Sequence, residues 1–286
     1  IYNARIKGVF KIGGLTSTNP IAVGDEVEMQ IEDVLEESAM IDTICDRKNY
    51  VARVSPHNKH QHHIIAANLD QSLLFATLKD PKTSQGFIDR FLISCEAYHI
   101  PAIIVFNKSD LYKQKELDHF AHLQKIYSNI GYQVMLCSVE KNKGVEEIAA
   151  LLEGKTTLLS GHSGVGKSTF INAVFPSLEL RTQEVSGWSG KGMHTTTFAE
   201  MFDLPTSGAI IDTPGIRELG LVDISKQELA HYFPEMRAQM GNCHFNNCMH
   251  IEEPGCAVKQ ALEAGAIAAD RYVSYLNILT TMDAAH

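Results

Sequence analysis

Long apolar runs are absent from this 286-residue chain, and so are an initiator methionine and a visible signal peptide. A membrane-spanning helix needs roughly 18 apolar residues, whereas the run from Ile100 to Phe106 is typical of the longest here. The chain begins at Ile1, inside a stretch typical of a strand, so we expect it to be truncated at its N-terminus. We expect a cytoplasmic protein with no part in a membrane.

A surplus of basic residues is missing too. Lys and Arg number 25 against 34 Asp and Glu, which gives a net charge of −9. A chain of this charge cannot rely on bulk electrostatic attraction to a nucleic acid, although it leaves room for local basic patches. The hydrophobic content of 44% is ordinary for a globular protein, and the length predicts about two domains.

The chain is organised around Leu158–Phe170, which reads LLSGHSGVGKSTF. Residues 161–168 fit the phosphate-loop pattern G-x-x-x-x-G-K-[ST]. They lie between a β-prone run, Thr156–Ser160, and a helix-compatible one, Thr169–Phe175. Glycines let backbone N–H groups point at phosphate oxygens, and a helix N-terminus adds positive potential. We expect a nucleotide to be bound by Gly161, Ser163, Gly164, Val165, Gly166, Lys167, Ser168 and Thr169.

Lys167 is expected to reach the β- and γ-phosphates and to act in catalysis, and Ser168 to bind Mg²⁺. A glycine-rich turn that binds nothing is the less favoured alternative. The loop alone does not distinguish ATP from GTP.

A second motif favours guanine. Asn107-Lys108-Ser109-Asp110 directly follows the apolar run Ile103–Phe106. There the carboxylate of Asp110 can accept hydrogen bonds from guanine N1–H and the 2-amino group, and adenine offers neither donor. Asn107 can bond the base edge, and the stem of Lys108 can cover the base. A helix N-cap is the alternative for an isolated tetrapeptide. Ser138, after the next strand, is expected against the base as well.

A third motif, DTPG at residues 212–215, follows the apolar run Ala209–Ile211. Asp212 in this position suits the coordination shell of Mg²⁺, and the N–H of Gly215 suits the γ-phosphate. A plain Pro-Gly turn is the alternative. Together with Ser168, Asp212 predicts that GTP or GDP is bound with Mg²⁺.

The six cysteines fall into two groups. Cys45, Cys95 and Cys137 stand in apolar surroundings and are expected to be buried thiols. Near the C-terminus, three cysteines and a histidine lie within fourteen residues, which in a cytosolic chain indicates a metal site rather than disulfides. Four such ligands predict one structural zinc per chain, with His244 a less favoured fourth ligand and unliganded thiols the alternative. The expected ligands are Cys243, Cys248, His250 and Cys256.

Residues 1–57 have an all-β pattern that favours a small OB-like barrel. Its basic residues are interleaved with as many acidic ones, so an RNA-binding face and an ordinary solvated surface are both consistent with it. The polar segment 55–63 contains four histidines in no fixed ligand spacing, and we expect a linker there rather than a metal site. The expected strands are Ala4–Ile12, Glu26–Val34, Ala39–Cys45 and Tyr50–Val54.

From Ile64 onward strands and helices alternate, which is typical of a mostly parallel sheet with helices on both faces. We expect residues 64–225 to form one α/β domain, and residues 226–286 a zinc-binding helical domain with helices at Lys226–Gly241 and Ala257–Leu279. The α/β domain is expected to contain strands at Asp70–Leu78, Ala102–Phe106, Gln133–Leu136, Thr156–Ser160, Phe198–Phe202 and Ala209–Ile211, and helices at Gly86–Tyr98, Gln114–Ile130, Val145–Leu152 and Thr169–Phe175.

The nucleotide motifs occur in a rotated order. In ordinary small GTPases the phosphate loop comes first, whereas here N-K-x-D and Ser138 precede it and D-x-x-G comes last. With a β-barrel before these motifs and a Cys3His set after them, the chain resembles the RsgA (YjeQ/YloQ) family of ribosome-small-subunit-dependent GTPases. The resemblance covers essentially the whole chain, in stretches such as LKDPKTSQGFIDRF, GHSGVGKSTFIN, GKGMHTTT and DTPGIREL.

This resemblance implies a fold and a function. The fold is a circularly permuted P-loop GTPase domain, preceded by an OB-like barrel and followed by a helical zinc domain. The function is hydrolysis of GTP to GDP and phosphate on the small ribosomal subunit (30S), late in its maturation, through contacts to 16S rRNA. We expect a monomer. The rival classes are a P-loop ATPase or kinase, and a nucleotide-regulated RNA-binding scaffold with little turnover.

The residue that places the hydrolytic water is not evident from the motifs. Ile216 stands where many small GTPases have a water-orienting Gln. His194 is our first candidate and His162 the second; equally open is that both histidines only pack and that the ribosome orders the site. The glycine-rich segment 184–197 ends in three threonines, of which Thr196 is expected to reach Mg²⁺ and the γ-phosphate. About ten residues separate D-x-x-G from the zinc domain, so we expect loss of the γ-phosphate to be passed to that domain.

Overall fold

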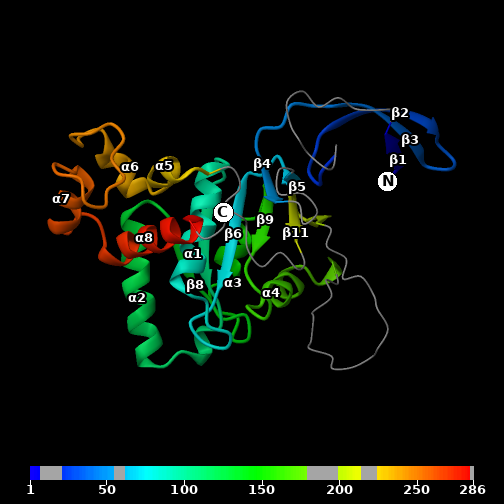
Figure 1. The fold of residues 1–286 in the computed structure, drawn as a ribbon. Coiled ribbons are helices and arrows are strands. Elements are labelled where there is room, and N and C mark those ends of the chain that lie inside the picture. Colours follow the sequence, from blue (N-terminus) through cyan, green and yellow to red (C-terminus); the bar gives the residue numbers. More distant parts are fainter. Residues whose placement is uncertain (7–20, 55–61, 179–198, 214–223, 284–286) are drawn as a thin grey trace, which may run out of the picture.

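The computed structural model describes residues 1–6, 21–54, 62–178, 199–213 and 224–283. In the described part, a six-stranded sheet forms the centre of the molecule (Figure 1). The order is β10-β11-β9-β6-β7-β8, and all neighbours are parallel except β10 and β11. Its strands are β6 (Gln71–Ala76), β7 (Ala102–Phe106), β8 (Gln133–Leu136), β9 (Thr156–Ser160), β10 (Glu200–Asp203) and β11 (Ala209–Asp212).

Alternate side chains of this sheet belong to two different hydrophobic cores. Leu74 and Ile104 share one core with helices α1 (Gln85–Ala97) and α2 (Gln114–Asn129). The neighbouring residues Leu73 and Ile103 share the other with α3 (Val145–Ala150) and α4 (Lys167–Val174). Because helices cover both faces, the inner strands are continuously apolar, as in AIIVF of β7. The ends of the expected elements of this domain agree with the structure to within two residues.

The chain path brings the nucleotide motifs to one edge of the sheet. The chain runs from β6 through β7 to β8 and then returns to β9, which pairs with the other side of β6. Parallel strands end at the same edge, and ligands of such sheets bind there, where the strand order reverses. The loops after β6, β7, β8 and β9 therefore meet at this edge, and Asp212 at the end of β11 joins them.

The N-terminal strands lie at one end of the molecule (Figure 1). Strands β1 (Asn3–Ile6), β2 (Val27–Asp33) and β3 (Ser38–Ile44) form a sheet in the order β1-β3-β2, and β4 (Tyr50–Val54) pairs with β5 (His62–Ala67). The four expected strands are thus present, but within the described residues they form a three-stranded sheet and a hairpin rather than a closed barrel. The rest of the first expected strand, residues 7–12, lies outside those residues.

β5 is a correction to the sequence analysis, which assigned residues up to 63 to a linker. His62 and His63 continue the pairing of β4 with the apolar run that follows. The sequence analysis missed the start of this strand because its first two residues are histidines at the end of a polar segment.

The C-terminal helices pack beside α1 and α2 (Figure 1). The sequence predicts two long helices here, and both are interrupted. Pro234, which has no N–H, begins a new helix, and Gly265 with φ of +75° follows the end of another. No helix in the parts of the chain that the structure describes has the length and apolarity to cross a bilayer. The helices are α5 (Lys226–Leu229), α6 (Pro234–Met240), α7 (Ala257–Glu263) and α8 (Ala269–Asp283).

A buried cluster of charges joins these helices to the sheet domain. Arg271 of α8 is fully buried and donates to Asp89 of α1 and Glu235 of α6, each at 2.6 Å. Its guanidinium carbon lies 4.5 Å from the ring centroid of Phe233. The hydroxyl of Tyr127 on α2 donates to Asp89 at 2.7 Å. The sequence analysis did not identify this cluster.

Candidate nucleotide and metal sites

The phosphate loop connects β9 to α4, which begins at Lys167, two residues before the expected start at Thr169. Gly161 and Gly166 have φ of +132° and +99°, values that other residues rarely adopt. A Cβ on Gly161 would lie 2.3 Å from the carbonyl oxygen of Phe75, and one on Gly166 would lie 2.3 Å from Nδ2 of Asn107. The loop thus passes so close to β6 and to the N-K-x-D motif that only glycine fits at these two positions.

Asn107 ties three loops together at this edge and is 2% exposed. Its Nδ2 donates to the carbonyl oxygen of Val165 at 3.0 Å, and its Oδ1 accepts from the N–H of Val139 and the thiol of Cys137, both at 3.3 Å. Tyr112 donates its hydroxyl to the Asn107 carbonyl oxygen at 2.7 Å. The amide nitrogen has a second N–H, so the bond to the base edge that the sequence predicts stays a prediction. Within the protein, Asn107 joins the phosphate loop to the loops after β7 and β8.

Asp110, Ser138 and Lys108 lie beside one another. The hydroxyl of buried Ser138 donates to Oδ1 of Asp110 and so orients this exposed carboxylate. Lys108 has a left-handed backbone with φ of +61°, and its Nζ donates to the carbonyl oxygen of Asp80 at 2.8 Å. The result is a fixed carboxylate at the surface, with a lysine stem stretched towards the loop after β6.

Lys167 and Asp212 are a cation and an anion in partly buried positions. Nζ of Lys167 donates to the carbonyl oxygens of Gly161 at 2.5 Å and His162 at 3.3 Å. Burial lowers the pKa of Lys167, and the charge of Asp212 opposes that shift. Burial raises the pKa of Asp212, and the charge of Lys167 opposes it in turn. Each group thus helps to keep the other ionised.

The chemistry of the donors fits Mg²⁺. Oδ1 of Asp212 is buried and has no hydrogen-bond partner among the described residues, which is costly for a carboxylate oxygen unless a cation satisfies it. Ser168, the second residue of α4, follows the loop at the same edge of the sheet. These two residues can hold the magnesium ion of a bound nucleotide, as their motifs predict.

A loop that the sequence analysis did not assign to the site, residues 77–84, borders the phosphate loop and is called here the β6–α1 loop. His162 Nε2 lies 2.7 Å from Oγ1 of Thr83. The ring of His162 packs edge-on against Phe87, with centroids 5.5 Å apart. A Cβ on Gly164 would lie 3.5 Å from Pro81. The signal that identifies this loop is its place directly after a parallel strand of the same edge.

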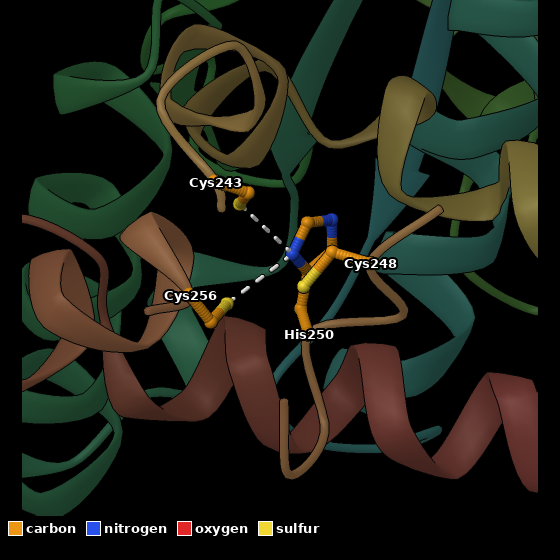
Figure 2. Close-up of side chains that lie close together, drawn as sticks. All are labelled: Cys243, Cys248, His250 and Cys256. Carbon is orange, nitrogen blue, oxygen red and sulfur yellow. Dashed lines mark hydrogen bonds between the residues drawn. The ribbon is translucent and has the colours of Figure 1, made fainter. Parts of the chain in front are cut away.

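The metal-ligand candidates converge in the C-terminal part, as Figure 2 shows. The ligand atoms of Cys243, Cys248, His250 and Cys256 all lie within 4.8 Å of one another. Nδ1 of His250 is 3.7 Å from the sulfur of Cys243 and 3.4 Å from that of Cys256. Tetrahedral zinc with ordinary bond lengths places nitrogen and sulfur ligands about 3.6 Å apart. His244 stands apart from this cluster, edge-on to Phe245 at 4.6 Å.

Neighbouring groups fix the loop that carries these ligands. Two tyrosines of α8 donate to it: Tyr272 to the carbonyl oxygen of His250 and Tyr275 to that of Met249, both at 2.7 Å. The carboxylate of Glu253 accepts from the N–H groups of Met249 and Ile251 at 2.7 and 2.8 Å. Burial lowers the pKa of His250, which favours the neutral imidazole that a metal ligand requires. The cluster can hold a metal ion.

Three residues of the predicted site lie outside the described residues, and so does Ile216. The three are His194 and Thr196 in the glycine-rich segment and Gly215 of D-x-x-G. Their roles stay predictions. His162, the second candidate for placing water, is described, and both its ring nitrogens lie near protein oxygens.

A parallel sheet with a phosphate loop, an N-K-x-D motif and the Asp of D-x-x-G at one edge defines a P-loop GTPase, and the order of these motifs makes it a circularly permuted one. The profile of the RsgA GTPase family matches residues 44–222. Because this match and the relatives below cover most of the chain, the chain belongs to the RsgA GTPase family and is a GTP-hydrolysing enzyme.

The relatives are similar over nearly their whole length. The small ribosomal subunit biogenesis GTPase RsgA of Cytophaga hutchinsonii is 54% identical over 282 residues, which cover 99% of this chain and 92% of that protein. The protein of the same name from Bacteroides fragilis is 50% identical and is covered to 89%. Among solved structures, YjeQ of Thermotoga maritima has a TM-score of 0.79 at 35% identity, covering 97% of this chain and 88% of that one. YloQ, described as a circularly permuted GTPase, has a TM-score of 0.75 at 31% identity, covering 100% of this chain and 87% of that one.

Proposed function

We propose that this GTPase acts in biogenesis of the small ribosomal subunit, and that binding to the 30S subunit stimulates its hydrolysis of GTP to GDP and phosphate. The observation that carries the proposal is the tie that Asn107 makes between the phosphate loop and the loops after β7 and β8. It supports one guanine-nucleotide site built from motifs that are far apart in the chain. The printed names of the curated relatives support the ribosomal role.

The described residues suggest a role for each part of the site. Asp110, oriented by Ser138, accepts from the guanine N1–H and 2-amino group, and the stem of Lys108 covers the base. The backbone N–H groups of residues 163–166 and the ammonium group of Lys167 bind phosphate oxygens, which neutralises the charge that develops on the γ-phosphate. Ser168 and Asp212 hold Mg²⁺. Gly215 and Thr196 complete this set as predictions, and His194 stays the candidate that orients water.

We further infer that the metal of the Cys3His cluster is zinc with a structural role. Three thiolates and one imidazole leave no open position for a substrate, which is typical of structural rather than catalytic zinc. Support comes from the sulfur–nitrogen distances of 3.4 and 3.7 Å. Zinc would then hold residues 241–256, a segment without helix or strand in the structure.

The partner surfaces belong to the same proposal. Residues 1–57 form the OB-like domain, residues 64–225 the GTPase domain, and residues 226–286 the zinc domain. Contacts to 16S rRNA come from the barrel and the zinc domain. They are few and local, because a chain with a net charge of −9 gains nothing from bulk attraction to RNA. The protein works as a cytoplasmic monomer.

Steady-state GTP hydrolysis with purified subunits tests this function. We expect slow hydrolysis by the protein alone and stimulation of at least tenfold by small subunits, with little effect of large subunits at the same concentration; a single added contact to the transition state worth about 1.4 kcal/mol suffices for that factor. An RNA-binding scaffold would bind small subunits under GTP without multiple turnovers. Equal stimulation by both subunits, or none by either, would contradict the proposal.

A further inference from the structure

The phosphate loop is a flexible backbone segment held at two places by side chains. Its glycines at 161, 164 and 166 all have φ between +83° and +132°, so the local sequence does little to restrict the backbone. Near its end, the amide of Asn107 holds the carbonyl oxygen of Val165 at 3.0 Å. Near its start, His162 contacts Thr83 at 2.7 Å. Asn107, which makes the first tie, belongs to the N-K-x-D motif. Thr83, which makes the second, belongs to none of the nucleotide motifs.

The hydrogen bonds around Thr83 and His162 together determine the direction of this second tie. Thr83 is 3% exposed. Its Oγ1 accepts from the N–H of Thr77 at 3.0 Å, and its own N–H donates to the Thr77 carbonyl oxygen at 2.7 Å. The carbonyl oxygen of Ser163 lies 3.3 Å from Nδ1 and can only accept, so the ring proton of a neutral His162 is on Nδ1. Nε2 then carries no hydrogen and accepts from the Thr83 hydroxyl.

This arrangement assigns a neutral imidazole to His162. Burial lowers the pKa of His162; the hydrogen bond to Ser163 opposes this shift, and the nearby ammonium groups of Lys167 and Lys108 add to it, so that the pKa is lowered overall. The edge-on contact with Phe87 fixes the plane of the ring. Nε2 is occupied by Thr83 and Nδ1 carries the proton, so neither nitrogen can accept a proton from a hydrolytic water in this position.

The backbone next to His162 is the part of the loop that places Lys167. The carbonyl oxygens of Gly161 and His162 both accept from Nζ of Lys167. Holding His162 therefore fixes where this ammonium group and the following backbone N–H groups lie. A loop held in its binding conformation loses less entropy when it binds phosphate, which strengthens binding.

We propose that His162, acting through Thr83 of the β6–α1 loop, is a positioning residue that preorganises the phosphate loop for nucleotide. It strengthens GTP and GDP binding to a similar degree and takes no part in the hydrolytic step. The proposal rests on nucleotide binding at this loop, as stated under the proposed function.

Four single variants and one double variant test the tie. His162→Phe keeps a ring against Phe87 and removes the hydrogen bond. Thr83→Val removes the hydroxyl, and with it the bond from the Thr77 N–H as well. His162→Gln and Thr83→Ser are the conservative controls, because each retains a group that can make the bond. The double variant His162→Phe/Thr83→Val measures the coupling. The readouts are Kd for GDP and a non-hydrolysable GTP analogue, kcat at saturating GTP with small subunits, and hydrogen exchange of residues 161–166 without nucleotide.

We expect His162→Phe and Thr83→Val each to weaken both nucleotides about five- to tenfold, the range of one lost hydrogen bond, with kcat within a factor of two of the wild type. The double variant should bind nucleotide no more weakly than Thr83→Val alone, and the conservative variants should be close to wild type. Exchange of the loop should be faster in the two disruptive variants. Additive losses, or a kcat that falls about a hundredfold at unchanged affinity, would overturn the proposal. If the wild type bound neither nucleotide, the proposed function would fail, while loop exchange would still decide whether the tie exists.

Discussion

At the scale of single residues, the nucleotide site depends on a few close contacts between distant parts of the chain. Asn107 follows β7 and Gly166 ends the phosphate loop, and a Cβ on Gly166 would lie 2.3 Å from Nδ2 of Asn107. The same Nδ2 holds Val165. Any side chain at 166 would therefore push Asn107 out of the position from which it ties the loops together.

Gly166→Ala is expected to weaken GDP and GTP binding by at least about a hundredfold, because it combines backbone strain at φ of +99° with loss of the Asn107 tie. Gly86→Ala is a matched control: a Cβ there has open space and the position lies in α1, where Ala is favourable. Titration with a fluorescent GDP measures both. Similar affinity of the two variants would show that the close approach at Gly166 does not control the loop.

Sequence motifs identify residues that the structure brings together, whereas contacts to remote partners were not predicted. The phosphate loop, N-K-x-D and the four metal ligands follow from spacing, and the structure brings each set together. The two hydrogen-bond ends of Asn107 and the Thr83–His162 pair could not be predicted, because such contacts depend on which loops the fold brings side by side.

At the scale of elements, the inner strands and amphipathic helices of the GTPase domain were predictable from their apolar patterns. Burial on both faces makes β7 continuously apolar, and α2 has buried residues at helical spacing, such as Phe120, Leu123 and Tyr127. Breaks within the C-terminal helices were not predicted, although Pro234 and Gly265 signal them. The arrangement of the N-terminal strands depends on long-range pairing, which periodicity does not contain.

The segment between α6 and α7 has no helix or strand, so zinc at its ligand cluster is expected to contribute to its stability. We expect elemental analysis to find about one zinc per chain. Removal of zinc by a chelator or by Cys248→Ala should increase hydrogen exchange in residues 226–283, because the binding energy of a structural zinc is folding energy. The affinity for GDP should stay within about twofold of the wild type.

Cys45→Ala is the control for this zinc experiment, because Cys45 is a partly buried thiol outside the cluster. It should leave both metal content and exchange unchanged. A protein that contains no stoichiometric zinc, or whose C-terminal exchange is the same with and without it, would refute the structural role.

At the scale of the whole molecule, the buried pairs of Arg271 connect the C-terminal helices to the GTPase domain. Asp89 on α1 and Glu235 on α6 share the one guanidinium, and Oδ2 of Asp89 has no partner among the described side chains and backbone groups. No local pattern marks this cluster, since its members are 182 and 36 residues apart along the chain. α1 also begins directly after the β6–α1 loop, so one helix contacts both the nucleotide side and the metal-binding side.

Arg271→Met is expected to lower the free energy of unfolding by about 3–5 kcal/mol, because it leaves two buried carboxylates without their cation. Arg237→Met is the matched control: Arg237 pairs with Glu96 at 3.0 Å, but its side chain is 48% exposed, and such pairs contribute less than about 1 kcal/mol. Urea unfolding followed by circular dichroism gives both values. Equal destabilisation by the two variants would mean that the buried cluster does not hold the domains together.

The central claim is that the loops at the edge of the permuted sheet form a guanine-nucleotide site read by Asp110. Competition of GTP, ATP and XTP against labelled GDP, for the wild type and for Asp110→Asn, tests it most directly. The account predicts that wild-type protein prefers GTP to ATP by more than about a hundredfold. Asp110→Asn should bind GTP more weakly and XTP more tightly than the wild type does. Its amide can donate to the 2-oxo group that xanthine has in place of the guanine amino group. Binding of ATP as tight as that of GTP, or a variant that still prefers GTP to XTP, would contradict the account.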